Sequence, residues 1–90
     1  MKTYHYIVKG IVQGVFFRHN TKEAALKHNI KGTVKNLFNG DVEVYAQGPE
    51  EDIVEFEEFL NAGPRLSRVD QVIKKIVDST EIFEDFKALY

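Results

Sequence analysis

The sequence contains no cysteine, no excess of basic charge and no long apolar run. The absence of cysteine excludes disulfide bridges, thiolate nucleophiles, and zinc or iron–sulfur sites built on thiolates. No stretch approaches the roughly 18 apolar residues that a membrane-spanning helix requires, and the polar first ten residues do not resemble a secretory signal. We therefore expect a cytoplasmic protein whose stability comes from a well-packed core.

Neither sign of charge dominates the chain: 12 Lys and Arg stand against 14 Asp and Glu, which gives a net charge of −2. Clustered basic residues supply the affinity of nucleic-acid-binding proteins for phosphate backbones, so this balance argues against nucleic acid as a partner. One small anion site remains compatible with it. A length of 90 residues is typical of one compact unit, and residues 1–90 are expected to form a single domain.

The first third of the chain predicts a strand followed by a helix. Tyr4, Tyr6 and Val8 alternate with polar residues, which is typical of a strand with one buried face. Residues 20–30 are rich in helix formers, and the spacing of Leu26 and Ile30 favours one apolar helical face.

The middle of the chain predicts a hairpin and a second helix. Asn39-Gly40 lies between the strand-like runs 33–38 and 41–47, which predicts an antiparallel hairpin whose two turn residues take positive φ. Pro49 and the three acidic residues after it indicate a helix start, and the sequence 61–64 ends that helix. The acidic run is therefore interpreted as a helix start rather than a metal site.

The last third predicts one or two further strands. Residues 68–78 are β-branched with imperfect alternation, which favours a strand with a bulge, and Phe86, Ala88 and Tyr90 share one face of a possible fifth strand. The order is βαββαβ, which indicates an α+β, ferredoxin-like sandwich: an antiparallel sheet of four to five strands with two helices on one face.

The segment GIVQGVFFR, residues 10–18, is the most informative for chemistry. Gly10 and Gly14 between a strand and a helix allow successive backbone N–H groups to face one point, where a helix N-terminus adds positive partial charge. Arg18 adds a planar, permanently charged fork suited to phosphate or carboxylate oxygens. A tight turn followed by a solvated arginine is an equally good interpretation of this local pattern.

Three phosphate-binding motifs can be tested against this segment. The P-loop and the dinucleotide fingerprint do not match the residues after Gly14 or the glycine spacing. Phosphatase loops place a cysteine before five residues and an arginine, and here Val12 occupies the cysteine position. A phosphorylated thiol intermediate is thus excluded.

The second informative segment is GTVKNLFNG, in which Asn36 lies on the same face of the predicted strand as Val34. A carboxamide at such a position is either a surface residue or a group that orients a water molecule. Among the histidines, His19 follows Arg18 directly, but adjacent helical residues lie about 100° apart, so we expect its ring to point away from any anion.

Together the two segments closely resemble the acylphosphatase family. The similarity runs from Val8 to Arg18 and from Gly32 to Val42, closes at Gly48-Pro49-Glu50, and continues weakly to Tyr90, so it covers essentially the whole chain. Thr33 is the clear departure, because the family usually carries an aromatic residue there.

The resemblance implies hydrolysis of acyl phosphates to a carboxylate and inorganic phosphate, without a metal or another cofactor. Carried over, Arg18 binds the phosphate with the backbone N–H groups of the loop Gly14, Val15, Phe16, Phe17 and Arg18. Asn36 positions the attacking water, and Thr21 supports this hydrogen-bond network. The partner implied is a small-molecule acyl phosphate; we expect a monomer with no nucleic-acid or membrane partner.

Two rival interpretations remain open at this point. One is a non-catalytic phosphate- or RNA-binding module, because related folds stack bases on strand aromatics, and this chain offers Tyr4, Tyr6, Phe38 and Tyr45. The other is an accessory domain of a larger protein. A chain that ends 90 residues after its initiator Met favours a stand-alone enzyme.

Overall fold

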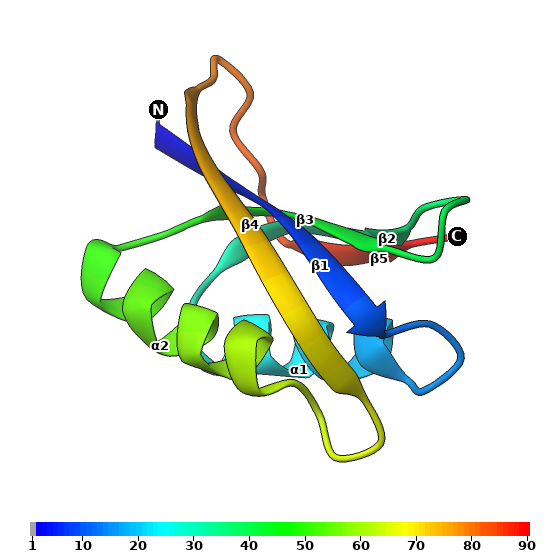
Figure 1. Cartoon of the computed structure of the whole chain (residues 1–90). Helices are drawn as coiled ribbons and strands as arrows, with labels where there is room; N and C mark the ends of the chain where they lie inside the picture. Colours follow the sequence, from blue (N-terminus) through cyan, green and yellow to red (C-terminus); the bar gives the residue numbers. More distant parts are fainter. Residues whose placement is uncertain (1) are drawn as a thin grey trace.

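The computed structural model describes residues 2–90 as one five-stranded sheet with two helices (Figure 1). The strands are β1 (Lys2–Ile11), β2 (Lys31–Asn36), β3 (Val42–Gln47), β4 (Arg68–Asp78) and β5 (Phe86–Leu89); the helices are α1 (Phe17–Lys27) and α2 (Glu50–Ala62). The strand order in the sheet is β4-β1-β3-β2-β5. The predicted βαββαβ ferredoxin-like fold is confirmed, and the possible fifth strand is present.

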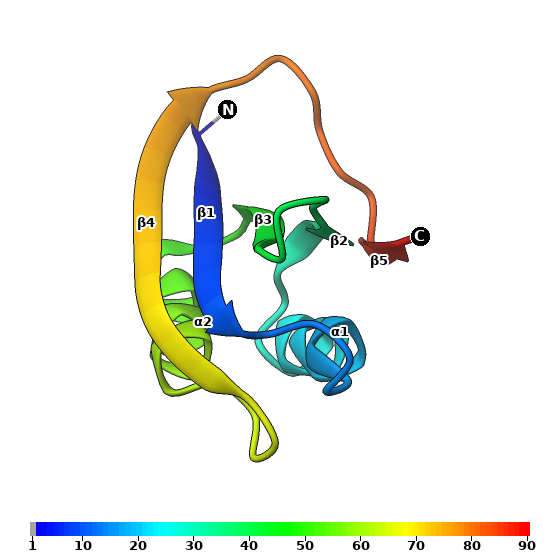
Figure 2. The ribbon, with the colours of Figure 1, turned by 45° about the vertical axis from the view of Figure 1, so that its right-hand side comes forward.

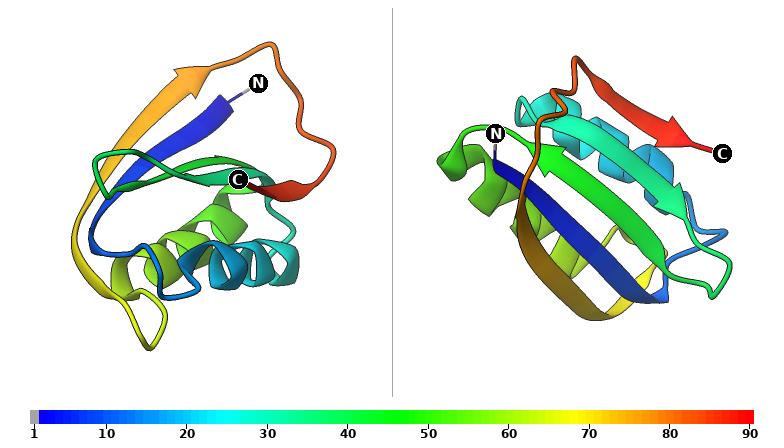
Figure 3. Two further views of the ribbon diagram at one scale, coloured as in Figure 1. Left: turned by 90° about the vertical axis from the view of Figure 1, so that its right-hand side faces the viewer. Right: turned by 90° about the horizontal axis from the view of Figure 1, so that it is seen from above.

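Both helices cover the same face of the sheet, as Figures 1 and 2 show. Helix α1 packs beneath β2 and β5, and α2 packs beneath β4. Seen from above, the segment between β4 and β5 crosses from one edge of the sheet to the other (Figure 3). Within residues 2–90, no helix is long and apolar enough to cross a membrane.

The core lies between the sheet and the helices, and its members come from alternating strand positions and from one stripe of each helix. Tyr4, Tyr6 and Val8 are buried as the alternation predicted. An aromatic cluster packs the helices against the sheet. The ring of Phe56 in α2 contacts the rings of Tyr6 and Phe86 at centroid separations of 6.4 and 6.1 Å. The other buried apolar side chains are Val12, Phe17, Ala25, Ile30, Val34, Val42, Val44, Ala46, Ile53 and Leu60.

The first helix is displaced from its predicted bounds. It occupies residues 17–27 rather than 20–30, and its buried stripe is Phe17, Thr21 and Ala25. Leu26 is exposed, and Ile30 is buried beyond the end of the helix. The predicted apolar stripe was wrong because the helix begins three residues earlier than predicted. Phe17, its first buried residue, lies in the segment that the sequence assigned to the glycine-containing loop.

The hairpin between β2 and β3 is confirmed, but its turn differs from the prediction. Gly40 has a positive φ of 95°, whereas Asn39 does not. The N–H of Gly40 donates to the carbonyl of Leu37 at 3.3 Å, and the N–H of Leu37 donates to the carbonyl of Asp41 at 2.9 Å. The connection is therefore a longer loop over 37–41 in which only the glycine needs a positive φ.

Two features of the remaining strands refine the sheet. The register of β1 with β4 shifts between Lys9 and Gly10, which leaves Asp70 as the extra residue of a bulge in β4, as the imperfect alternation predicted. Strand β5 pairs with β2 in parallel, so the sheet is mixed rather than wholly antiparallel. The long crossing after β4 brings β5 to β2 in this direction.

Candidate active site

The two informative segments of the sequence meet in one pocket at the start of α1. It has a volume of about 320 Å³, and its lining includes Arg18 from the first turn of α1 and Asn36 from the end of β2. The other lining residues are Val12, Gly14, Phe16, Phe17, His19 and Tyr90. Chain segments from three parts of the sequence thus form the pocket, and the residues predicted to be catalytic share it.

Two contacts with Leu89 and Tyr90 position the guanidinium of Arg18. Its Nη1 donates a hydrogen bond to the carbonyl of Leu89 at 2.9 Å, and its guanidinium carbon lies 4.2 Å from the centre of the Tyr90 ring. A ring face favours a nearby cation. Because one amino group is engaged by Leu89, the remaining N–H donors of the guanidinium can meet an anion in the pocket.

The loop before α1 contains two residues with positive φ, a conformation that favours glycine. Gly14 has a φ of 73°, and Phe16, which is the N-cap of α1, has the left-handed φ and ψ of 61° and 24°. Asn20 holds this turn, since its backbone N–H and its Nδ2 both donate to the carbonyl of Phe16 at 3.0 Å. Left-handed backbone is uncommon for a residue with a side chain, and such strain is concentrated at functional sites.

The N-terminus of α1 has no side-chain cap. Phe16 cannot accept a hydrogen bond through its side chain, and the first turn contains no acidic residue. The first N–H groups of any helix have no carbonyl partner within it and carry positive partial charge. In α2, by contrast, Glu50, Glu51 and Asp52 occupy the first turn, as the interpretation of this run as a helix start predicted. Neither helix has a side-chain cap, but the first turn of α1 carries no carboxylate that would compete with an anion, whereas the first turn of α2 carries three acidic residues.

Asn36 carries the most unusual polar atom of the site. Its Oδ1 is buried and has no hydrogen-bond partner within residues 2–90. A buried, unpaired acceptor is unfavourable by about 1–3 kcal/mol, so such groups are rare in folded proteins. Because Asn36 lines the Arg18 pocket, a ligand or water molecule that enters the pocket can donate a hydrogen bond to this oxygen.

Gln13 connects the two halves of the site. Its Nε2 donates to the carbonyl of Leu37 at 2.7 Å and to the carbonyl of Asp41 at 2.8 Å. The loop that leads to Arg18 is thereby fixed to the segment that follows Asn36. The local pattern did not assign a role to Gln13, although Gln13 lies within the segment 10–18 that resembles the acylphosphatase family.

The other residues considered for the site differ in their burial and in their distance from the pocket. Thr21 is fully buried on α1, its hydroxyl has no hydrogen-bond partner among the described residues 2–90, and it does not line the pocket. Phe17 is a core residue, whereas Phe16 is 71% exposed. His19 lies at the pocket, but its ring is largely exposed, and its Nε2 lies 3.9 Å from Glu23 Oε1 along the helix.

Tyr90 and the carbonyl of Leu89 are two further site features that the sequence did not indicate. They lie 72 and 71 positions after Arg18, and no local pattern connects residues at such a separation. The sequence placed Tyr90 on a possible fifth strand without assigning it a contact. Only the parallel pairing of β5 with β2 brings it to the pocket.

The aromatic residues considered for an RNA-binding surface do not form one. Tyr4 and Tyr6 are buried under the sheet, where they face the helices. On the open face, Tyr45 contacts the ring of His5 at a centroid separation of 4.6 Å. Phe38 lies away from them, on the fully exposed tip of the β2–β3 loop. The stacking platform expected of an RNA-recognition sheet is therefore not built from these residues.

Comparisons with known proteins identify one family that this chain resembles over nearly its whole length. A family model described as acylphosphatase matches residues 4–88. An acylphosphatase of Vibrio parahaemolyticus is 48% identical over 89 residues, which are 99% of this chain and 98% of that protein.

Solved structures with the same fold include relatives of this chain. An acylphosphatase from Bacillus subtilis is 37% identical and has a TM-score of 0.94, with 100% of both chains covered. HypF from T. kodakarensis is 40% identical with a TM-score of 0.88, and the match covers 100% of this chain and 12% of that one. The same fold therefore occurs both as a chain of matching length and as a segment of a much larger protein.

Proposed function

The chain belongs to the acylphosphatase family, and from this premise we propose that it hydrolyses acyl phosphates by direct attack of water on phosphorus. The observation that carries the mechanism is the meeting of Arg18 with the buried, unpaired Oδ1 of Asn36 in one pocket. A cation for the phosphate and an acceptor for water are the two groups that such a reaction needs.

Arg18 and the backbone N–H groups of residues 14–18 bind the phosphoryl oxygens in this proposal. The uncapped start of α1 supports it, because the helix supplies donors and positive partial charge without a competing carboxylate. The Arg18 guanidinium neutralises charge that spreads over these oxygens during phosphoryl transfer.

Asn36 orients the nucleophile. Its Oδ1 accepts a hydrogen bond from a water molecule, whose oxygen attacks phosphorus while the bond from phosphorus to the acyl oxygen breaks. One water proton passes to the substrate itself, so that the products are a carboxylate and dihydrogen phosphate. An acyl phosphate has a good leaving group, so positioning and charge stabilisation can supply most of the catalysis.

The decisive experiment measures hydrolysis of benzoyl phosphate and acetyl phosphate in the presence of a chelator. We expect activity in the wild type and a loss of roughly 10³–10⁵ in rate for Arg18→Ala, the range seen for phosphate-clamping arginines. Asn36→Ala should lose comparable turnover with a smaller effect on KM. An inactive wild type, or a fully active Arg18→Ala, would contradict the proposal.

Two further measurements separate this mechanism from its rivals. In water enriched in heavy oxygen, attack at phosphorus places the label in phosphate, whereas attack at the acyl carbon places it in the carboxylate. His19→Ala should retain activity within a few fold; a large loss would instead indicate that His19 acts as a base. Phosphate binding without turnover would identify the non-catalytic binding module.

A further inference from the structure

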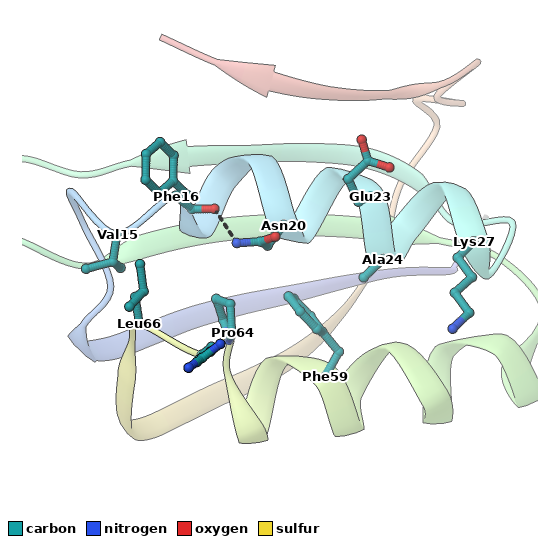
Figure 4. Close-up of a pocket in the computed structure, with 10 residues that line it drawn as sticks. Val15, Phe16, Asn20, Glu23, Ala24, Lys27, Phe59, Pro64 and Leu66 are labelled. Carbon is teal, nitrogen blue, oxygen red and sulfur yellow. Dashed lines mark hydrogen bonds between the residues drawn. The ribbon is translucent and has the colours of Figure 1, made fainter.

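A second, more apolar groove adjoins the phosphate pocket. It lies between the two helices and the segment after α2, and it has a volume of about 630 Å³. Its apolar members are Val15, Phe16, Ala24, Phe59, Pro64 and Leu66, with Asn20, Glu23, Lys27 and Arg65 also lining it. In Figure 4 the ring of Phe16 lies at the start of α1 on the side away from Phe59 and Pro64, Val15 and Leu66 lie at the same end of the groove, and Phe59 projects from α2 between the helices.

Phe16 lines both this groove and the phosphate pocket. Its side chain is 71% exposed, and Leu66 in the same groove is 66% exposed. Large apolar side chains exposed together on a concave surface are typical of a binding site.

The backbone of Phe16 adds an independent observation. The residue has a left-handed conformation that glycine or asparagine adopts with less strain. The ring is exposed, so core packing does not explain why a phenylalanine stands at this position. Strain retained at an exposed residue beside a pocket indicates that the side chain itself has a role there.

A third pocket of about 490 Å³ lies on the opposite flank of the site. It shares Asn36 and Tyr90 with the phosphate pocket, and Leu37 and Phe38 also line it. The acyl part of a substrate could thus extend past Asn36 into this third pocket or past Phe16 into the groove between the helices.

The geometry of phosphoryl transfer distinguishes the two directions. The attacking and leaving oxygens lie roughly in line through phosphorus. In the function proposed above, the attacking water is held by Asn36, so the acyl oxygen must leave on the side of phosphorus remote from Asn36. The third pocket contains Asn36, whereas the groove beyond Phe16 does not.

We propose that the groove between α1 and α2 binds the acyl group of the substrate, with Phe16 as the residue that determines specificity. The substrate class that follows is acyl phosphates with an aromatic or other bulky apolar acyl group. Phe16 contacts the part of this group nearest to the carbonyl, and Leu66 contacts its more distant part. This inference depends on the proposed hydrolysis, because the in-line argument needs the water at Asn36.

The test compares kcat/KM for acetyl, benzoyl and 4-phenylbenzoyl phosphate in each variant. The ratio of an aryl substrate to acetyl phosphate cancels any general change in phosphate binding. Phe16→Asn tolerates the left-handed backbone and removes the ring, so the benzoyl-to-acetyl ratio should fall about tenfold, the scale of a lost apolar contact. Leu66→Ser should lower the kcat/KM ratio of 4-phenylbenzoyl phosphate to acetyl phosphate.

Phe38→Asn is the matched control, because it removes a fully exposed phenylalanine from the third pocket. It should leave every ratio unchanged. Unaltered ratios in both Phe16→Asn and Leu66→Ser, or a ratio lowered by Phe38→Asn instead, would overturn the inference while hydrolysis itself stands. A wild type that hydrolyses none of the three substrates would overturn the proposed function, and the inference with it.

Discussion

The Arg18 guanidinium stacks on the ring of Tyr90, with its central carbon 4.2 Å from the ring centre. Tyr90 is itself 95% exposed, so this contact depends on the cation rather than on burial of the ring. The neighbouring carbonyl of Leu89 accepts a hydrogen bond from the same guanidinium at 2.9 Å. The end of the chain therefore orients the side chain that we propose binds the phosphate.

Replacing Tyr90 by alanine tests this orientation. An exposed cation–π contact contributes about 0.5–1 kcal/mol, so Tyr90→Ala should lower kcat/KM for acetyl phosphate about two- to fivefold, mainly through KM. Tyr90→Phe keeps the ring face and should restore the wild-type value. Equal activity in all three proteins would show that the ring does not position Arg18.

Gln13→Leu tests the link between the two halves of the site. The variant loses the hydrogen bonds to the carbonyls of Leu37 and Asp41 and should be less stable by about 1–3 kcal/mol. Turnover should fall more than tenfold, because misplacement of catalytic groups by about 1 Å can cost two orders of magnitude. Urea denaturation and steady-state kinetics measure the two effects separately.

Gln47→Leu is the control for that prediction. Gln47 is buried near the opposite end of β3, and its side chain bonds Thr3 Oγ1, the carbonyl of Glu81 and the N–H of Phe83 at 2.8–3.0 Å. It should lose a similar amount of stability with kcat unchanged. If both variants reduced kcat equally at a temperature where both are folded, general destabilisation would explain the result for Gln13.

Thr21→Val tests the proposed supporting role of Thr21. The hydroxyl is buried and has no hydrogen-bond partner in the described part of the chain, so its replacement by a methyl group of similar size should raise stability by about 1 kcal/mol. Groups retained at such a cost commonly serve activity, and we expect turnover to fall several-fold. Thermal unfolding and kcat for Thr21→Val and Thr21→Ser provide the comparison; a more stable variant with full activity would limit Thr21 to packing.

The alkaline stability of the fold should depend on Tyr6. Burial, together with its 2.6 Å hydrogen bond to Glu57, raises the pKa of Tyr6 above the usual value for a phenol. The unfolded chain loses this proton near pH 10 while the folded protein retains it, so stability is unaffected below about pH 10 and declines above it.

Tyr6→Phe removes this titration. The decline in unfolding free energy between about pH 9.5 and 11 should become shallower, by at most about 1.4 kcal/mol per pH unit. Lys74 still pairs with Glu57 at 2.7 Å in the variant, so the carboxylate keeps a partner. Denaturation curves across this pH range measure the slope. A Tyr6→Phe variant with the same slope of unfolding free energy against pH as the wild type would contradict the prediction. Burial also raises the pKa of Tyr45, so the variant keeps a smaller slope from that residue.

Local patterns in the sequence determined the type and order of the elements. Period-two alternation, helix formers, the Asn39-Gly40 turn and the acidic helix start each act through neighbouring residues, so the βαββαβ order followed from them. The limits of α1 did not follow from local patterns, because Phe17 lies both at the end of the glycine-containing loop and in the first turn of the helix. The turn type at Asn39 also differed, because hydrogen bonds of the hairpin favour a longer loop.

For the site, the sequence by itself determined which residues we propose carry the chemistry: the glycine-containing loop, Arg18 and Asn36 lie within two recognisable segments. Only the tertiary structure decided how they meet. The parallel pairing of β5 with β2 brings Tyr90 to Arg18, and Gln13 fixes the loop to the hairpin. These contacts join residues tens of positions apart, and their formation depends on packing of the whole sheet, for which no short stretch of sequence holds the information.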